Sequence, residues 1–391
     1  MTTPEAETKS PDDSSDPKYR VIAGLLRGRI LAGDYGGGRR LPSEAALVAR
    51  HGVSRPTAAR ALQELVREGL VERRAGMGSF AVENPAAGAG RRELGLLTPQ
   101  WETTEIFEKI CAQLAGLARA RDFGMFWKNA KPPAAPPAGE NAKRAASEAE
   151  TAGQLCDEFI KRKLDGVFFA PLELSANRRE VNQRIAGLFQ QAGIPVVLID
   201  RELAEFPQRG ALDLASMDNI AAGSLIASHL LKLGCRRIAF FTRPRSAPTV
   251  AARIAGVREA MVRAGTGGWD GDSVIEGDPS DAALVRRALV RRRWDACVCA
   301  NDRTAAQLMQ TLLRLGVRVP RDLRVAGFDD AKYATLVAVP LTTVHQPCDE
   351  IAALAFDAML RRLANPLAPP CAFLATPRLV VRESCGTYLP R

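Results

Sequence analysis

The chain has 391 residues, of which 46% are hydrophobic and 25% charged, and a formal net charge of +10 at pH 7. This length exceeds one ordinary core and predicts two or three domains, and the composition is too apolar for a disordered chain. The longest apolar stretches, such as residues 193–199, are far shorter than the ~20 residues of a membrane-spanning helix, so we expect no membrane partner.

The first 17 residues are acidic and rich in Ser and Pro, and they lack the basic and apolar regions of a secretory signal. We therefore expect a disordered tail over residues 1–17 and a cytoplasmic protein. The eight cysteines show no zinc spacing, so neither a structural metal nor a disulfide is expected. Cys297 and Cys299 alternate within an apolar run, which predicts two buried thiols on one face of a strand.

The basic excess is concentrated near the N-terminus. Residues 18–82 hold 12 Lys or Arg against 5 Asp or Glu, a net charge of +7. A charge run alone is usually a solvated face, but a clustered basic surface favours phosphate-rich partners. The charge therefore indicates nucleic acid without proving it.

Three helices and a hairpin are predicted in this basic segment. Apolar residues at helical spacing predict a first helix over residues 18–32. Ser43 can cap a second helix and Ser54 a third, and the short link between them is typical of a helix-turn-helix. Residues 70–74 and 79–82 then predict two short strands around a glycine-containing turn, which form a wing.

The pattern changes after the wing. Residues 83–92 are rich in Pro, Ala and Gly and predict a linker that lacks the apolar face of a hinge helix. Beyond it, apolar runs alternate with amphipathic helices, which is typical of an α/β domain with parallel sheets. Residues 129–150 interrupt this pattern and predict a mobile surface loop. The predicted strands lie at 94–97, 166–170, 196–199, 238–241, 296–300 and 325–328.

The helix-turn-helix and wing contain Arg-Arg-Leu-Pro-Ser-Glu at 39–44, Val-Ser-Arg-Pro-Thr at 53–57 and Arg-Arg-Ala-Gly-Met-Gly-Ser-Phe at 73–80. With these runs the segment resembles the GntR family of winged helix-turn-helix regulators. The resemblance implies a DNA-binding domain over residues 18–82, with Gly76 approaching the minor groove at the wing tip. The other residues that it places on the DNA face are Arg40, Ser43, Ser54, Arg55, Thr57, Arg60 and Arg74.

Four residues of this domain are not expected to read bases. Arg73 and Arg74 are expected to contact phosphates, which adds affinity and salt dependence but no sequence preference. Ala59 and Met77 depart from the family, in which a basic residue and a lysine are common at these positions. The resemblance therefore implies no base contact there.

The remainder of the chain carries a second series of motifs. In order they include Val-Val-Leu-Ile-Asp-Arg at 196–201, Arg-Ile-Ala-Gly at 253–256, Ala-Asn-Asp at 300–302, Gly-Phe-Asp-Asp at 327–330 and Pro-Leu-Thr-Thr-Val at 340–344. With them the chain resembles the effector domain of the LacI/GalR family, which shares its two-lobed fold with periplasmic sugar-binding proteins. The implied fold class is α/β: an N-terminal winged helix-turn-helix followed, over residues 93–391, by a two-lobed periplasmic-binding-protein-like domain with parallel sheets.

Candidate ligand residues follow the predicted strands. Asp200, Asn301 and Asp329 each come after an apolar run, at the carboxyl ends where open α/β sheets bind their ligands. Carboxylates accept hydrogen bonds from hydroxyls, whereas Arg and Asn donate them. The resemblance carries ligand contact onto Asp200, Arg253, Asn301, Asp329 and Gln346, and position in strand-end loops adds Trp101 and Arg201. We expect Asp302 and Asp330 to cap helices or pair locally, and Asp218 and Asn219 to fix a turn.

No catalytic motif accompanies these residues, since the chain has no phosphate loop, no GxSxG and no dinucleotide fingerprint. We expect no enzyme activity and no cofactor. The pattern instead predicts a transcription regulator, a repressor of carbohydrate-metabolism genes that binds double-stranded operator DNA as a homodimer under control of a small sugar-like effector. A similar build, a GntR-type head on a LacI-type domain, occurs in arabinose-type repressors. A nucleoside or a phosphorylated metabolite remains an alternative effector.

Overall fold

The computed structural model describes residues 19, 22–26, 40–67, 71–74, 77–81, 92–98, 105–127, 153–266 and 269–389. Their contacts divide the chain into two compact units, Met1–Arg91 and Arg92–Arg391. The predicted tail over 1–17, linker residues 83–91 and the predicted loop over 129–150 lie outside the described residues. No helix of the described ranges is long and apolar enough to cross a membrane.

The first unit, the head, packs helices against a hairpin. Helix α2 (Glu44–His51) begins after Ser43, whose hydroxyl accepts a hydrogen bond from the Ala46 amide at 3.2 Å, and it ends at Gly52 with φ 60°. The predicted cap is therefore confirmed, because the short polar side chain satisfies a free amide of the first turn. The other described elements of the head are a helical stretch at 22–26, within the predicted first helix, and α3 (Arg55–Arg67), β1 (Val71–Arg74) and β2 (Gly78–Ala81).

The wing strands pair antiparallel, as predicted, and a third segment joins them. Arg40 forms a bridge with Phe80, and the Leu41 amide donates to the Ser79 carbonyl at 2.8 Å. These contacts attach the hairpin to the segment that directly precedes α2. The core beneath consists of buried apolar side chains that include Leu41, Leu47, Leu62, Leu65 and Val71.

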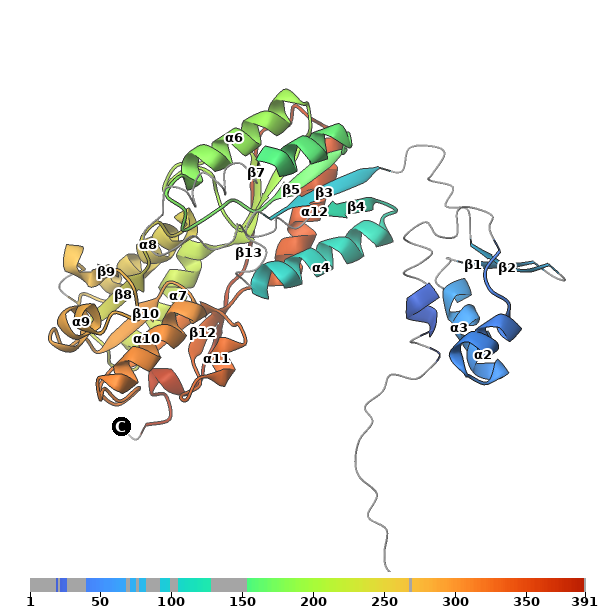
Figure 1. Ribbon diagram of the computed structural model, residues 1–391. Coiled ribbons are helices and arrows are strands. Elements are labelled where there is room, and N and C mark those ends of the chain that lie inside the picture. The colour runs from blue at the N-terminus through green and yellow to red at the C-terminus, as the bar shows by residue number, and fades with distance from the viewer. Residues whose placement is uncertain are drawn as a thin grey trace, which may run out of the picture. The chain divides into compact units, whose positions relative to one another are not determined.

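The second unit has two lobes, each built on a six-stranded sheet (Figure 1). All neighbouring strands pair parallel except β14 with β12. In sheet order the first lobe has β13 (Ala372–Ala375), β7 (Asp213–Met217), β6 (Val196–Ile199), β5 (Gly166–Phe169), β3 (Glu93–Leu97) and β4 (Gly124–Trp127). The second lobe has β14 (Arg378–Val380), β12 (Thr342–His345), β11 (Arg324–Asp329), β10 (Ala296–Cys299), β8 (Ile238–Thr242) and β9 (Val274–Glu276).

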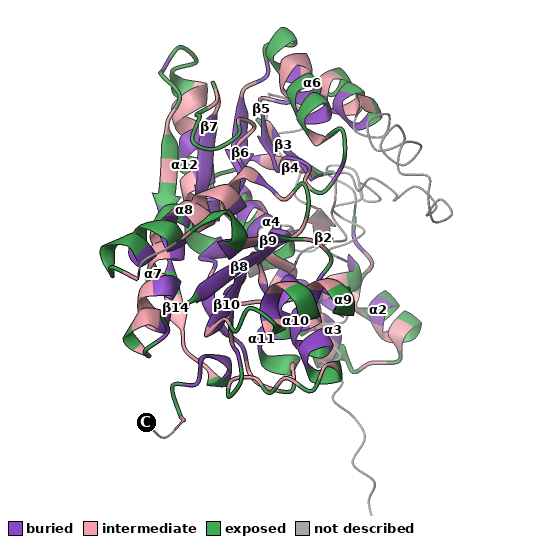
Figure 2. Ribbon diagram, turned by 90° about the vertical axis from the view of Figure 1, so that its left-hand side faces the viewer, coloured by how far each residue is buried: buried purple, intermediate pink, exposed green. Residues whose placement is uncertain are grey.

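Helices cover both faces of each sheet, so the central strands are buried on both sides (Figure 2). Phe168 packs into the core on one face, whereas Val167 and Phe169 pack on the other. Cys297 and Cys299 both face the second lobe's own core, which confirms the predicted alternation. The helices of the first lobe are α4 (Glu105–Ala120), one at 153–161, α6 (Arg178–Gln191) and α12 (Cys348–Ala364). The second lobe has α7 (Asn219–Lys232), α8 (Pro248–Arg263), α9 (Ala282–Val285), α10 (Asp302–Arg314) and α11 (Tyr333–Leu336).

The chain crosses between the lobes three times. The crossovers run from β7 to α7, from β12 to α12 and from β13 to β14. Each lobe is therefore made from discontinuous stretches of the sequence. The six predicted runs are all strands, but the six others, β4, β7, β9, β12, β13 and β14, were not predicted. Several are short edge strands that lack a continuous apolar run.

Candidate functional site

Three of the predicted ligand residues lie where strands end at the junction of the lobes. Asp200 follows β6, Asp329 ends β11, and Asn301 comes two residues after β10, so the predicted placement is confirmed. Asp200 has φ 66° and Asp329 has φ 114°, conformations that residues other than glycine rarely adopt. Such backbone strain persists where surrounding contacts hold it, and it concentrates at functional sites.

Gln346 connects the two lobes through its side chain. It lies in the second crossover and is only 1% exposed, and its Nε2 donates to Asp200 Oδ1 at 2.6 Å. Its other side-chain atom, Oε1, is buried and has no hydrogen-bond partner, the one such side-chain atom among the described residues. A buried carbonyl without a donor is costly, so this atom indicates a place for a donating group such as a hydroxyl.

Arg253 is held from several directions. Its Nε donates to Asn219 Oδ1 at 2.8 Å, and its Nη1 donates to the Ala300 carbonyl at 2.7 Å. Nη1 also lies 3.7 Å from Asp329 Oδ1, and the guanidinium lies over the Phe328 ring at 4.6 Å. The side chain is therefore buried in one orientation, in which it faces the carboxylate predicted to bind the same ligand.

Arg201 is the second buried guanidinium at the junction. Its Nη2 donates to Glu173 Oε1 at 2.6 Å and its Nη1 donates to the Pro171 carbonyl at 2.9 Å. Its Nε lies 3.5 Å from Asp200 Oδ2, and the group lies over the Phe107 ring at 4.8 Å. The positive charge of Arg201 therefore stabilises the ionised carboxylate of Asp200. The same carboxylate accepts the hydrogen bond from the side-chain amide of Gln346.

Asp329 has an unusual protonation equilibrium. Burial raises its pKa well above the usual range; the nearby guanidinium of Arg253 lowers it, and the carboxylates of Asp302, Asp200 and Glu173 raise it. The junction is therefore rich in carboxyl groups, and burial favours the neutral, protonated form of Asp329. Among the described residues, no group of three or more His, Cys, Asp or Glu is arranged to hold a metal ion.

The helix cap at the start of α10 differs from the one expected. Asn301, and not Asp302, caps the helix, because its side chain accepts from the Thr304 amide at 2.9 Å. The expectation that Asp302 caps a helix or pairs locally was wrong. Its carboxylate accepts from Thr343 Oγ1 at 2.7 Å and from the Ala331 amide at 3.0 Å, and burial raises its pKa to about 7. These partners are distant in sequence, which is why local reasoning missed them.

Asp330 hydrogen-bonds to a histidine and an arginine beside the second crossover. It accepts from His345 Nδ1 at 3.0 Å and from Arg382 Nη2 at 2.6 Å. Although partial burial raises its pKa, these hydrogen bonds hold the pKa of Asp330 below its usual range. His345 directly precedes Gln346, so these hydrogen bonds anchor the segment that carries the unpartnered carbonyl.

The structure thus joins five of the seven predicted ligand residues through hydrogen bonds or close charge contacts: Asp200, Arg201, Arg253, Asp329 and Gln346. Asn301 is adjacent to Ala300, which accepts from Arg253, and Trp101 lies outside the described residues. Sequence reasoning did not assign Glu173 and Asn219 to the site. Their only signal was a polar residue shortly after a buried strand, which is common at any strand end.

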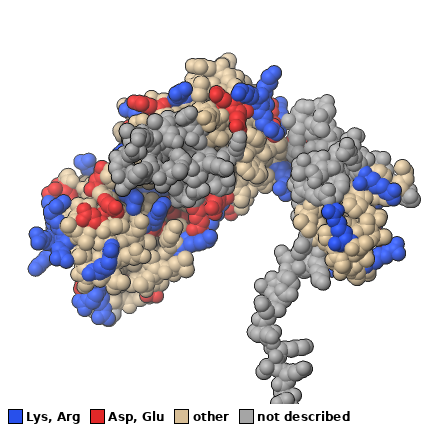
Figure 3. All heavy atoms as spheres, in the orientation of Figure 1, with Lys and Arg blue, Asp and Glu red and all other residues tan. Residues whose placement is uncertain are grey.

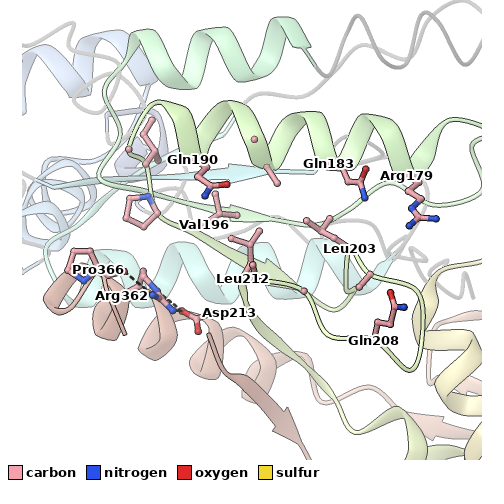
Figure 4. Close-up of a pocket in the computed structure, with 18 residues that line it drawn as sticks. Arg179, Gln183, Gln190, Val196, Leu203, Gln208, Leu212, Asp213, Arg362 and Pro366 are labelled. Atoms are coloured by element: carbon pink, nitrogen blue, oxygen red, sulfur yellow. Dashed lines mark hydrogen bonds and ion pairs between the residues drawn. The ribbon is translucent and has the colours of Figure 1, made fainter. Parts of the chain in front are cut away.

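A separate groove lies on the outside of the first lobe (Figure 4). It has a volume of about 560 Å³ and runs between α6 and the loop before β7, with Gln183 and Gln190 on the helix side. Arg362 pairs with Asp213 at one end, at 2.8 Å. None of the predicted ligand residues lines this groove.

In the head, Arg55 begins the third helix and leaves 81% of its side chain exposed. Its Nε lies 3.7 Å from Glu44, which also accepts from Arg73 Nη2 at 2.9 Å. The hydroxyls of Ser54 and Thr57 hydrogen-bond to each other at 2.8 Å. One acidic residue therefore connects the second helix, the third helix and the wing.

The other predicted DNA residues are spread over the head. Arg60 lies over the ring of Tyr19 at 4.2 Å, and Arg40 lies beside Gly78, where an added Cβ would be 2.9 Å from its Nε. Basic side chains appear at several places on the face of the head seen in Figure 3. Gly76 and the side chain of Arg74 lie outside the described residues.

Two family models match the chain. Residues 18–81 match the bacterial regulatory proteins of the gntR family, and residues 227–385 match a periplasmic binding protein-like domain. With the head and the two-lobed unit, these matches define a transcription regulator in which a GntR-type helix-turn-helix precedes a periplasmic-binding-protein-like domain. Both predicted resemblances are confirmed.

Relatives that span much of the chain agree with this class. The ribose operon repressor of Escherichia coli K12 is 30% identical over 231 residues, which cover 58% of this chain and 67% of that protein. The arabinose metabolism transcriptional repressor of Geobacillus stearothermophilus is 24% identical over 376 residues, or 94% and 97% of the two chains. The solved transcription regulator CcpA of Lactococcus lactis has the same fold, with a TM-score of 0.62 and 18% identity over 75% of this chain and 99% of that one. The chain belongs to the LacI-type family of sugar-operon transcription regulators, and its head is of the GntR type.

Proposed function

We propose that this chain represses carbohydrate-metabolism genes and that a neutral pentose, bound where the lobes meet, controls its affinity for operator DNA. The observation that carries this proposal is the buried set of polar side chains around Gln346, whose Oε1 has no donor. An unpaired acceptor among carboxylates and guanidinium groups is complementary to a ligand with many hydroxyls. A pentose fits this chemistry, and the two relatives above are named for ribose and arabinose.

Each polar group has a proposed role. Asp200 and Asp329 accept hydrogen bonds from sugar hydroxyls, Gln346 Oε1 accepts another, and Asn301 donates through the amide that is left after helix capping. Arg201 and Arg253 donate and hold the carboxylates in place. We also propose that Trp101, which lies outside the described residues, stacks on the sugar ring through its aromatic face.

The charge balance argues against the alternative of a phosphorylated metabolite. Four carboxyl groups lie at the junction with two guanidinium groups: Asp200, Asp329, Asp302 and Glu173 with Arg201 and Arg253. Burial raises the pKa of Asp329 and Asp302, which favours their neutral forms. Arg201 and Arg253 already face these carboxyl groups, so a phosphate would bury a further negative charge without an unpaired cation to balance it, which is costly. A neutral ligand avoids this cost.

Regulation then follows from movement of the lobes. The Leu174 amide donates to the Arg245 carbonyl at 3.0 Å, and the Lys332 amide donates to Glu105 at 2.8 Å, so both contacts join the lobes. Because the site between them is buried, we propose that the lobes separate to admit the ligand. A ligand that binds the joined state better shifts the population toward it, and the shift alters how two heads fit an operator.

We propose a homodimer that reads two half-sites, with dimer contacts on the exposed apolar face of α10 and α11. Leu313, Tyr333 and Leu336 are 69%, 48% and 78% exposed there. Arg55 at the start of α3 is the central base-reading residue, in the position that recognition helices use. The other proposed DNA contacts are Arg40, Ser43, Ser54, Thr57, Arg60, Arg74 and Gly76. A regulator of this kind has no catalytic role and works in the cytoplasm, where operator DNA is.

The test is thermal unfolding with D-ribose, L-arabinose, D-xylose and D-ribose 5-phosphate, repeated with Arg253→Ala and Asp329→Ala. A ligand at about 100 times its Kd stabilises the folded state by about 2.7 kcal/mol, which raises Tm by several degrees. We expect a shift with one free pentose, none with the phosphate, and none in either variant. Arg263→Ala, an exposed change on the same helix as Arg253, is the control. A shift with the phosphate alone contradicts the proposal.

A further inference from the structure

We infer that Asn219 is a positioning residue for ligand binding, which orients the guanidinium of Arg253 through its side-chain carbonyl. The inference rests on the proposed function for the ligand, but it concerns a residue that contacts the site only through another. Asn219 was expected only to fix a turn between strand and helix. Its contacts assign it a more specific role.

Asn219 is the first residue of α7, immediately after the first crossover, and it is 7% exposed. Capping of this helix is carried out by Asp218, whose carboxylate accepts from the Ala221 amide at 3.0 Å. The Asn219 side chain is therefore not needed as the cap. Its Oδ1 accepts from Arg253 Nε at 2.8 Å instead.

The geometry at Arg253 makes this contact decisive for orientation. The guanidinium is planar, so hydrogen bonds at Nε and at Nη1 together define both its position and its rotation. Asn219 supplies the acceptor at Nε, and Ala300 supplies the one at Nη1. Without Asn219, rotation about the end of the side chain is limited by the one remaining hydrogen bond to Ala300, by the Phe328 ring and by Asp329 at 3.7 Å.

The side chain of Asn219 also hydrogen-bonds to residues of the first lobe. Asn219 Nδ2 donates to the Met217 carbonyl at 2.9 Å and to Ser216 Oγ at 3.3 Å. Ser216 Oγ donates to the carbonyl of Asp200 at 2.8 Å. A buried chain of hydrogen bonds therefore connects Asp200 in one lobe with Arg253 in the other, and it passes through the crossover.

Two near-isosteric substitutions separate the positioning role from a structural one. Asn219→Asp keeps an acceptor for Arg253 but loses the donor to Met217 and Ser216. Asn219→Leu keeps the approximate volume but loses both. If Asn219 matters only for the turn, both variants lose the same donor and have similar effects; if it positions Arg253, only the leucine variant loses ligand affinity.

The experiment is isothermal titration calorimetry of the full chain with D-ribose, with the other free pentoses as further probes. We expect Asn219→Leu to weaken binding about 10- to 100-fold, the effect of losing a hydrogen bond to a charged group, and Asn219→Asp to stay within about threefold of the wild type. In an Arg253→Lys background, which has no Nε, Asn219→Leu should add less than about threefold. Equal losses in the Leu and Asp variants, or full additivity with Arg253→Lys, overturn the inference.

A second measurement tests the inference without a sugar. In urea unfolding, Asn219→Leu, Arg253→Met and the double variant form a cycle. We expect the midpoint shifts to be non-additive, because each single change leaves the other group unpaired. Additive shifts overturn the inference even if a pentose binds. If no pentose binds the wild type but the cycle is non-additive, the proposed ligand class fails and the positioning contact stands.

Discussion

Gln346 Nε2 donates to Asp200 Oδ1 at 2.6 Å, and so a residue of the second crossover is bonded to a strand end of the first lobe across 146 positions of sequence. The contact uses only half of the amide, because Oε1 of the same side chain has no partner. One end of the Gln346 side chain therefore joins the two lobes, and the other end is free to accept a hydrogen bond from a hydroxyl-bearing ligand.

Gln346→Leu should abolish most pentose binding, with a loss of affinity of about 10- to 100-fold. It removes the acceptor proposed for a sugar hydroxyl and the amide that supports Asp200. Titration calorimetry with the pentose that stabilises the wild type measures the loss. Gln190→Leu, an exposed change on α6, should bind as the wild type does. Unchanged binding in Gln346→Leu removes Gln346 from the site.

Arg55→Ala should weaken binding to an operator duplex selected from random sequences by about 10- to 100-fold at fixed salt and relax base preference at one position per half-site. The side chain is largely exposed and stands at the start of the proposed recognition helix. Fluorescence anisotropy at several salt concentrations separates base from phosphate contact. Arg263→Ala in the other unit is the control for lost charge. If the variant keeps its base preference but its affinity depends less steeply on salt concentration, Arg55 contacts a phosphate and not a base.

Asp302→Asn should change how stability depends on pH. Burial raises the pKa of Asp302 to about 7, above the unfolded value of 3.8, so the folded state binds more protons between these values. Its contribution is therefore fully present below about pH 4 and is lost as the pH rises through about 7, with a slope of at most about 1.4 kcal/mol per pH unit. The amide of the substituted side chain mimics the protonated carboxyl and should flatten the slope in urea unfolding at pH 4 to 8.

The control for this pH effect is Asp322→Asn. Hydrogen bonds from Arg318 lower the pKa of Asp322 to about 2, so its contribution changes only below about pH 4. The slope between pH 4 and pH 7 should therefore stay as in the wild type. If Asp302→Asn leaves that slope unchanged, the carboxyl of Asp302 does not titrate in this range.

Gly223→Ala should destabilise the second lobe by at least about 3 kcal/mol. Gly223 on α7 faces α8, where an added Cβ would lie 2.0 Å from the Arg253 carbonyl, closer than any real contact. Urea unfolding measures the effect. Gly116→Ala is the matched control, because this helical glycine of α4 has no neighbour within 4 Å of its Cβ position, and the alanine should stabilise by up to about 1 kcal/mol. Equal stability of the two variants contradicts the close helix crossing.

Leu336→Glu should weaken self-association at least about tenfold, because it places a charge in the apolar face proposed for the dimer. Sedimentation equilibrium over a range of concentrations measures the change. Leu367→Glu is the control, since Leu367 is 94% exposed in the turn after α12, away from α10 and α11. If Leu336→Glu dimerises like the wild type, the dimer interface lies on another surface.

Local patterns in the sequence were sufficient for much of this protein. The cap at Ser43, the hairpin of the wing, the six buried strands and the strand-end positions of Asp200, Asn301 and Asp329 all depend on residues a few positions apart. Such features follow from hydrogen bonding and burial within a short segment, so a few neighbouring residues are enough to predict them.

Tertiary structure alone decided which of these residues meet. The bond from Gln346 to Asp200, the contact of Asn219 with Arg253 and the distant partners of Asp302 join segments 29 to 146 positions apart. They depend on the order of strands in two sheets and on three crossovers between lobes, which no local pattern encodes. The sequence by itself determined the elements and the chemistry available at their ends; packing of the lobes determined which carboxylates, amides and guanidinium groups share one buried site, because burial and charge act between neighbours in space.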